Sequence, residues 1–164
     1  MPERLESERG NAEMTKPILR AVIESDLRML FEHQRDPIAT QMAAFLSRDW
    51  DAFAAHWRRV LGDPTNCKRT VLVGDAVAGD IGSWNQGDER LVGYWFGRAY
   101  WGRGIATAAL AEFLLHDTAR PLHAYVATHN VASIRVLEKC RFRRVGDGHV
   151  LGDEVREHRF RLDG

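Results

Sequence analysis

The sequence is poor in the features that mark metal, redox or membrane proteins. Cys67 and Cys140 are its only cysteines, without a Cys-x-x-Cys pair or a histidine cluster, which argues against a zinc site and fits a reducing cytoplasm. It has no long uncharged apolar run and no signal-peptide core. Because 23 lysines and arginines balance 23 aspartates and glutamates, its net charge gives no attraction toward nucleic acid. These absences predict a cytoplasmic protein with no metal, no nucleic-acid partner and no membrane partner.

The length of 164 residues suits one domain, since a chain of this size buries roughly two-thirds of its unfolded surface. Residues 1–16 are charged and show no apolar periodicity, so we expect a flexible N-terminal extension there. Residues 17–164 are then predicted to form a single domain.

Alternating and β-branched segments predict strands, and apolar residues that repeat every three or four positions predict helices. The expected strands span residues 18–22, 69–74, 76–84, 90–96 and 122–127, with a closing hairpin of 142–145 and 155–162. The expected helices begin at Leu27, run from 38 to 61 in two pieces split near Ser47, and span 104–118 and 130–140. The short turns Gly74-Asp75 and Asn85-Gln86-Gly87-Asp88 predict an antiparallel meander. The later strand, helix, strand passage predicts a parallel pair joined by a right-handed crossover. The predicted fold class is mixed α/β, with a mostly antiparallel sheet flanked by helices.

Polar residues precede two of the predicted helices. Ser25-Asp26 is expected to cap the helix that starts at Leu27. Asp49 is expected to cap the second helical piece of the region 38–61.

Three aromatic residues, Trp50, Phe53 and Trp57, fall on one face of the second helical piece. Aromatic stripes at helical spacing usually pack in a core, so this interpretation is favoured over a substrate-lining role.

A glycine-bearing turn connects the strand at 90–96 to the helix that starts near residue 104. Gly102 and Gly104 remove side-chain bulk, Arg103 adds a cation and Thr107 offers a hydroxyl group. The first N–H groups of a helix lack internal partners and carry the positive end of the helix dipole, so the turn suits an anion such as a pyrophosphate. It is not a P-loop, because no Gly-Lys-Ser/Thr follows, and Thr107 stands where the dinucleotide fingerprint has its third glycine.

The turn resembles the acetyl-CoA pyrophosphate loop of the GNAT superfamily of N-acetyltransferases, written Gln/Arg-x-x-Gly-x-Gly/Ala. Trp101 takes the Gln/Arg place, Gly104 the glycine and Ala106 the final small residue. Together with Gly93-Tyr94-Trp95, it resembles one branch in particular, the ribosomal-protein and spermidine N-acetyltransferase-like group. In that group a tryptophan at the first position is usual.

A second block lies the expected distance downstream. Residues 130–142 are similar to that group's Asn-x-x-Ser-x-x-x-x-x-Lys-x-Gly-Phe segment, with Asn130, Ser133, Lys139 and Phe142 in the matching places. Two ordered motifs with matched separation are more specific than either motif alone.

The resemblance implies the acyl-CoA N-acyltransferase fold, with acetyl-CoA in a V-shaped opening between the strand ending at Phe96 and the strand ending at Ala127. A β-bulge near Trp95 or Phe96 is expected to aim a backbone group at the thioester. The residues expected to contact the cofactor are Tyr94, Trp95, Phe96, Trp101, Gly102, Arg103, Gly104, Ile105, Ala106, Thr107, Asn130, Ser133 and Arg135.

The resemblance also implies direct transfer, in which a primary amine attacks the thioester in a ternary complex and CoA leaves as a thiolate. Better-known members protonate that thiolate with a tyrosine on the last helix, but the matching residue here is Leu137. Ser133 is then the candidate acid. Asn130 is expected to cap the helix and to reach the pantetheine arm. Glu89 is the candidate base, although a solvated turn carboxylate is the more frequent interpretation.

The end of the last helix departs from the family as well. Arg141 stands where the family has a glycine, which costs about 1 kcal/mol if the left-handed geometry persists. Cys140, among apolar neighbours, is expected to be a packed thiol rather than a nucleophile.

The leading hypothesis is an acetyl-CoA-dependent N-acetyltransferase whose acceptor is a small-molecule or peptide amine, such as a polyamine or a protein N-terminus, acting as a monomer or homodimer. The alternative is a catalytically silent acyl-CoA-binding or regulatory module, which Leu137 permits. A nucleotide-binding protein is less consistent with the sequence, because neither nucleotide fingerprint is present.

Overall fold

The structure is a computed structural model that describes residues 16–151 and 155–164. Apart from Lys16, the predicted extension lies outside the described residues. The described part of the chain begins with β1 (Ile18–Ala21), a 3₁₀ turn (Glu24–Asp26), α2 (Leu27–Gln34), α3 (Pro37–Ala43), α4 (Trp50–Gly62), β2 (Cys67–Val73), β3 (Ala76–Gln86) and β4 (Glu89–Phe96). It continues with a second 3₁₀ turn (Arg98–Tyr100), α5 (Ile105–His116), β5 (Leu122–Ala127), α6 (Val131–Lys139), β6 (Arg143–Leu151) and β7 (Val155–Leu162).

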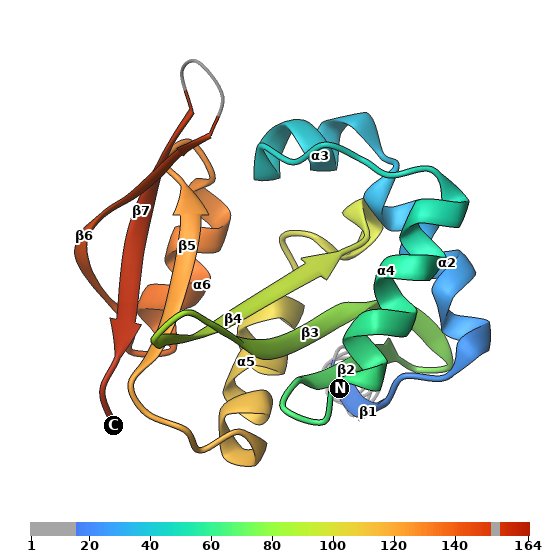
Figure 1. The fold of residues 1–164 in the computed structure, drawn as a ribbon, viewed down its shortest axis with the longest axis horizontal. Coiled ribbons are helices and arrows are strands. Elements are labelled where there is room, and N and C mark those ends of the chain that lie inside the picture. The colour runs from blue at the N-terminus through green and yellow to red at the C-terminus, as the bar shows by residue number, and fades with distance from the viewer. Residues whose placement is uncertain (1–15, 152–154) are drawn as a thin grey trace, which may run out of the picture.

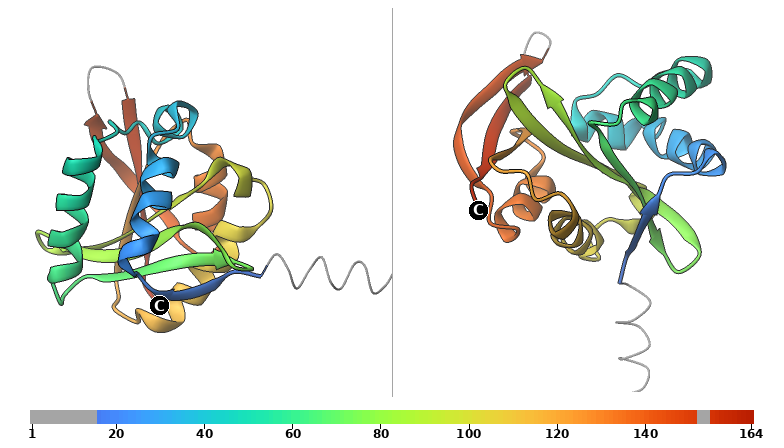
Figure 2. Two further views of the ribbon diagram at one scale, coloured as in Figure 1. Left: turned by 90° about the vertical axis from the view of Figure 1, so that its right-hand side faces the viewer. Right: turned by 60° about the horizontal axis from the view of Figure 1, so that its bottom comes forward.

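The strands form one seven-stranded sheet in the order β1-β2-β3-β4-β5-β7-β6. Every neighbouring pair is antiparallel except β4 and β5, which are parallel and joined through α5. Helices α2, α3 and α4 lie on one side of the sheet, and α5 and α6 lie on the other (Figures 1 and 2). The predicted mixed α/β class with a mostly antiparallel sheet is therefore confirmed.

Two core clusters hold the helices to the sheet. The larger cluster lies under α5 and α6 and contains fully buried residues such as Ile81, Leu110 and Phe113. The smaller one joins α2 and α4 through Phe53 and Trp57, which are 1% and 3% exposed. The core interpretation of the aromatic stripe is thus confirmed.

Side-chain caps set the starts of α3, α4 and α6. Asp36 accepts a hydrogen bond from the N–H of Ile38 at 3.0 Å, and Asp49 accepts one from Ala52 at 2.8 Å. The break predicted near Ser47 and the cap predicted at Asp49 are both present.

Asp26 does not cap α2, contrary to the sequence prediction. Its carboxylate is buried and pairs with Arg20 at 2.7 Å, while Thr70 on β2 donates its hydroxyl at 2.7 Å. It also accepts the N–H of Ile23 at 3.0 Å, at the start of the preceding 3₁₀ turn. That turn runs directly into α2. The carboxylate therefore caps the start of the turn and links β1 to β2, rather than capping α2.

The prediction of a β-bulge near Trp95 or Phe96 is also wrong. The pairing of β4 with β3 runs without a break from Glu89 to Phe96, and the bulge lies one strand away, between β2 and β3, where Ala78 is the extra residue. The carbonyl oxygen of Ala78 accepts the N–H of Gly97 at 2.9 Å. The end of β4 is therefore held in register by β3 rather than bent by a bulge of its own.

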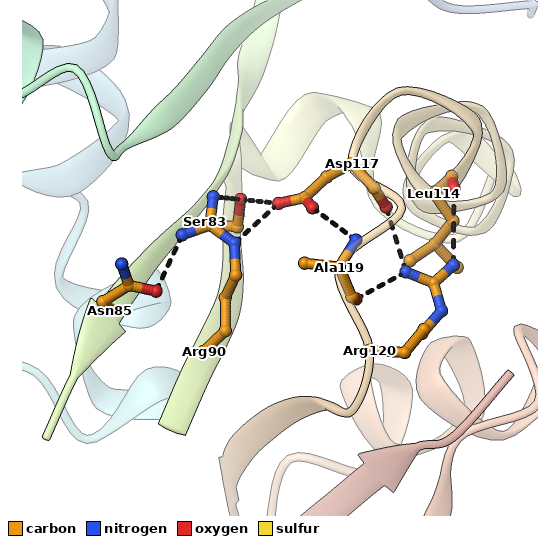
Figure 3. A network of polar contacts seen from close by, with 7 residues as sticks. All are labelled: Ser83, Asn85, Arg90, Leu114, Asp117, Ala119 and Arg120. Carbon is orange, nitrogen blue, oxygen red and sulfur yellow. Dashed lines mark hydrogen bonds and ion pairs between the residues drawn. The ribbon is translucent and has the colours of Figure 1, made fainter. Parts of the chain in front are cut away.

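The C-terminal end of α5 is fixed to the sheet by Asp117 (Figure 3). Its carboxylate accepts hydrogen bonds from the Ser83 hydroxyl on β3 and, at 3.0 Å, from Nε of Arg90 on β4. Arg120 donates to the backbone oxygens of Asp117 and Ala119 at 3.0 and 2.8 Å. Buried charge-assisted hydrogen bonds of this kind hold a helix in one position, and here they fix the end of α5 against β3 and β4.

Within the described part of the chain, no helix is long and apolar enough to cross a membrane. The same residues contain no group of three or more histidine, cysteine, aspartate or glutamate side chains placed to hold a metal ion.

Candidate functional site

The parallel strands β4 and β5 separate soon after they meet. Among residues 16–151 and 155–164, their pairing is limited to Leu91 and His123, and Figure 1 shows the two arrowheads pointing apart. A cavity of about 120 Å³ lies in the opening. It is lined by Ala43, Val92, Gly93, Tyr94, Ala124, Tyr125, Val126, Ala127, Asn130, Ser133, Leu137 and Glu157. The V-shaped opening expected between these strands is therefore present, and we call it the cleft.

The turn that leads into α5 leaves the start of that helix open. Gly102 and Gly104 have φ angles of +70° and +75°, the left-handed region that glycine adopts at least cost. Gly104 is the N-cap residue and provides no side chain, so no side chain caps the first turn. The N–H groups of Ile105, Ala106 and Thr107 thus have no partner within the helix. This is the geometry in which a helix N-terminus binds an anion.

The side chains of this turn differ in their exposure. Arg103 is exposed, and its guanidinium carbon lies 5.7 Å from the centre of the Tyr100 ring. Trp101 is 39% exposed, and its indole N–H donates to the carbonyl oxygen of Phe96 at 3.0 Å. Ile105 is 1% exposed, so it can offer a ligand only its backbone. The indole of Trp101 thereby ties the turn before α5 to the end of β4.

The three predicted residues at the end of β4 point in alternate directions. Tyr94 and Phe96 belong to the cluster under α5 and α6, with their ring centres 5.9 Å apart. Trp95 points to the opposite side of the sheet, where its indole N–H donates to the carbonyl oxygen of His33 at 3.1 Å. The ring of Phe45 lies 5.4 Å from that of Trp95. Any contact of Trp95 with a ligand beside α6 must therefore come from its backbone.

The start of α6 forms one wall of the cleft. Asn130 caps the helix, since its Oδ1 accepts the N–H of Ser133 at 3.2 Å. Oγ of Ser133 lies 2.7 Å from the hydroxyl oxygen of Tyr94 on β4. Burial raises the pKa of Tyr94 to about 12, although the hydrogen bond with Ser133 opposes that shift. Leu137, one turn further on, is 1% exposed and adds only apolar surface.

The other predicted residue on α6, Arg135, is exposed and does not line the cleft. The structure does not bring it together with Asn130 and Ser133. Cys140 at the end of the helix is buried, which raises the pKa of its thiol. Its sulfur lies 3.5 Å from the carbonyl oxygen of Thr107. The burial and the raised pKa match the packed thiol that the sequence predicts.

Glu89 lies where β4 begins, but it is not a solvated turn residue. Its carboxylate accepts the hydroxyl of Tyr125 at 2.6 Å and forms an ion pair with Arg159 on β7. The hydrogen bond from Tyr125 is the main cause that lowers the pKa of Glu89, and burial opposes it. Glu89 borders a separate cavity of about 220 Å³ rather than the cleft.

Sequence reasoning assigned no role to the side chains of two residues that line the cleft. Tyr94 was expected to contribute its backbone, yet its hydroxyl reaches α6. Glu157 on β7 is the one charged side chain among the described residues that line the cleft. Strand alternation places Tyr94 on the same side as Phe96, which was a usable signal. Nothing in the sequence indicates that β7 lies beside β5.

A parallel strand pair that separates beside an uncapped, glycine-led helix start has the geometry that suits an extended ligand with an anionic group. The chain belongs to the GNAT acetyltransferase family: the sequence profile described as "Acetyltransferase (GNAT) domain" matches residues 17–143. Members of this family use acetyl-CoA as the acetyl donor. No curated protein sequence matches the chain at a significant level.

Solved structures share the fold. The spermidine N-acetyltransferase from Vibrio cholerae, solved in complex with CoA and spermine, has a TM-score of 0.79 at 14% identity and covers 91% of this chain and 96% of its own. A GNAT family acetyltransferase from Bacillus anthracis has a TM-score of 0.77 at 18% identity, with coverages of 90% and 95%. An N-acetyltransferase from Staphylococcus aureus Mu50 has a TM-score of 0.76 at 18% identity, with coverages of 90% and 98%.

Proposed function

We propose that the chain transfers the acetyl group of acetyl-CoA to a primary amine, by direct attack in a ternary complex, and that it belongs to the ribosomal-protein and spermidine N-acetyltransferase-like branch. The observation that carries the proposal is the cleft between β4 and β5, which has the open start of α5 beside it and Ser133 and Asn130 in its wall.

The residues present suit acetyl-CoA. The unpartnered N–H groups at the start of α5 and the cation of Arg103 match a pyrophosphate. β4 has its sheet partner on the β3 side, and past Leu91 its other edge faces the cleft. Extended backbone of this kind binds amides such as those of a pantetheine arm. When bound, acetyl-CoA supplies an activated acetyl group as a thioester.

Ser133 and Asn130 are placed to act on the thioester end. Both line the cleft, and the cap from Asn130 to the Ser133 N–H fixes the first turn of α6. We propose that the Ser133 hydroxyl donates a hydrogen bond to the departing sulfur. A donor held beside developing negative charge lowers the barrier more than it stabilises the bound substrate.

The acceptor is proposed to be a cationic amine such as a polyamine. The carboxylate of Glu157 in the cleft wall suits an ammonium group. The relative from Vibrio cholerae, whose structure contains spermine, acts on spermidine. A protein N-terminus presents the same group, and the assay below separates the two acceptors.

The test measures thiol release from acetyl-CoA with polyamines, amino acids, aminoglycosides and peptide N-termini as acceptors. We expect turnover with at least one amine. Tight binding of CoA without turnover on any of them would instead favour a silent acyl-CoA-binding module.

Calorimetric titration of CoA tests the proposed pyrophosphate site at the start of α5. Gly104→Asp places a carboxylate at the start of α5, where its negative charge repels the pyrophosphate and competes for the positive end of the helix dipole. We expect the affinity for CoA to fall at least about tenfold, or about 1.4 kcal/mol. Gly74→Asp is the matched control, because Gly74 has a φ of +60° in the β2–β3 hairpin, away from the cleft. Undiminished affinity in the Gly104 variant would refute the proposed site.

A further inference from the structure

A hydrogen bond joins the two walls of the cleft. The Tyr94 hydroxyl on β4 lies 2.7 Å from Oγ of Ser133 on α6, and 3.4 Å from the carbonyl oxygen of the same residue. Both side chains line the cleft, although they lie 39 positions apart in the sequence. The first distance is that of a well-formed O–H···O hydrogen bond, and the second is too long to compete with it.

The direction of this hydrogen bond follows from the surroundings of Tyr94. Its ring is packed into the core cluster under α5 and α6, and burial keeps the phenol protonated at every physiological pH, because its pKa is about 12. A phenol donates more strongly than an aliphatic hydroxyl, since it is the more acidic of the two groups. When Tyr94 donates to Oγ, the hydroxyl hydrogen of Ser133 is free to point away from Tyr94.

We infer that Tyr94 is a positioning residue, which donates a hydrogen bond to Oγ of Ser133 and thereby directs the Ser133 hydroxyl hydrogen into the cleft, toward the sulfur of the thioester. This inference rests on the proposed function. It also explains how the site can work with Leu137 in place of the tyrosine of better-known members. The phenol comes instead from Tyr94 on the facing strand β4, and it acts through Ser133.

The chemistry needs no further reactant. The new C–N bond forms as the C–S bond breaks, the amine gives up its proton to water, and the electron pair left on sulfur accepts the hydrogen bond from Ser133. Protonation of the thiolate by water completes the reaction. Without Tyr94, the Ser133 hydroxyl can rotate and donate to other acceptors, so the hydrogen bond to sulfur must be formed at an entropic cost.

The test compares Tyr94→Phe, Ser133→Ala and the double variant by steady-state kinetics with acetyl-CoA and the best amine of the panel. We expect Tyr94→Phe to lower kcat at least about tenfold and to leave the KM for acetyl-CoA within about twofold. The loss in the double variant should equal that in Ser133→Ala alone, because Tyr94 acts only through Ser133. Tyr100→Phe, which removes a hydroxyl from a ring beside the same core cluster, is the control and should retain the wild-type kcat.

Three results would overturn the inference. A kcat of Tyr94→Phe within about twofold of wild type would do so, as would losses that multiply in the double variant, since a merely structural role predicts independent effects. A wild-type protein that acetylates no amine removes the proposed function and the inference with it, whereas the first two results leave the function standing. If the Phe variant does not fold, as judged by thermal unfolding, Tyr94→Met serves as the second hydroxyl-free variant, because methionine fills irregular core space.

Discussion

The hydroxyl of Tyr125 donates a hydrogen bond of 2.6 Å to one carboxylate oxygen of Glu89, and Arg159 pairs with the other. One carboxylate therefore joins β4, β5 and β7 near the point where β4 and β5 still pair. His123 lies at the same place, with its Nε2 4.0 Å from Glu89. The cleft opens away from this cluster, so the cluster closes its narrow end.

Glu89→Gln tests whether this carboxylate is the catalytic base that the sequence suggested. Its two partners lower the pKa of Glu89 and occupy both oxygens, so we expect a role in holding the strands. The variant should lose about 1–2 kcal/mol of unfolding free energy, because hydrogen bonds to a charged group are weakened. The pH profile of kcat/KM between pH 6 and 9 should keep its shape.

Chemical denaturation and pH-dependent kinetics measure these two effects. Arg159→Lys is the companion variant, since it keeps the charge but changes the geometry of the pair. A loss of kcat of about a hundredfold or more in Glu89→Gln, together with the loss of the acidic limb of the profile, would establish Glu89 as the base instead.

Much of the fold could be predicted because its signals are local. The cap at Asp49, the turn Gly74-Asp75 and the strand at 122–127 each follow from neighbouring residues, and the structure has all three. The errors concern residues whose partners are distant in sequence. Asp26 looks like a cap until β2 brings Thr70 to it, and the bulge could not be assigned to Ala78 without the strand register.

Asp26 predicts a specific loss of stability in acid. Burial alone would raise its pKa, but the hydrogen bonds from Arg20, Ile23 and Thr70 outweigh burial and lower the pKa from 3.8 to about 2. A carboxylate with a lowered pKa in the folded state stabilises that state above its unfolded pKa. We therefore expect about 2 kcal/mol of stability to disappear as the pH falls from about 4 to about 2.

Urea unfolding of the wild type and Asp26→Asn at pH 7 and at acidic pH measures this loss. The variant should be less stable than wild type at pH 7 and should lose less on acidification, since it has no proton to take up at this position. Asp75→Asn is the control, because Asp75 is exposed in the turn between β2 and β3. An equal acid dependence in wild type and Asp26→Asn would contradict the assignment.

Arg141 carries a backbone strain that a glycine would relieve. Its φ angle is +70°, and the N–H groups of Arg141 and Phe142 bond back to Glu138 and Leu137 at 3.0 Å each. This is the Schellman arrangement that ends many helices and favours glycine at this position. We expect Arg141→Gly to raise the unfolding free energy by about 1 kcal/mol.

The matched control is Glu138→Gly, an exposed position inside α6, where glycine should lower the unfolding free energy by about 1 kcal/mol. Thermal or urea unfolding gives both values. If Arg141→Gly lowers the unfolding free energy as Glu138→Gly does, the left-handed conformation at Arg141 is not strained.

The part of the candidate site that depends on backbone conformation could be predicted from the sequence. The open start of α5 follows from Gly102 and Gly104, since their lack of side chains is itself the signal. The side chains of the cleft depend on which strands and helices face one another. For this reason the contact between Tyr94 and Ser133, and the position of Glu157, could be found only in three dimensions.

Glu157 is expected to select a cationic acceptor. A carboxylate in a half-closed cleft attracts an ammonium group more strongly than one in open water, because solvent screens the pair less. Glu157→Gln removes the charge and keeps the shape, so the KM for a polyamine should rise at least about fivefold. The KM for acetyl-CoA should stay within about twofold, since the open start of α5 is unchanged.

Steady-state kinetics with spermidine and with a peptide N-terminus measures this selection, and Glu138→Gln, on the exposed side of α6, controls for the change in net charge. The rise in KM should be larger for spermidine, which carries several ammonium groups, and it should shrink as the salt concentration increases. If the KM for both amines is the same in Glu157→Gln and in wild type, the acceptor does not bind beside β7.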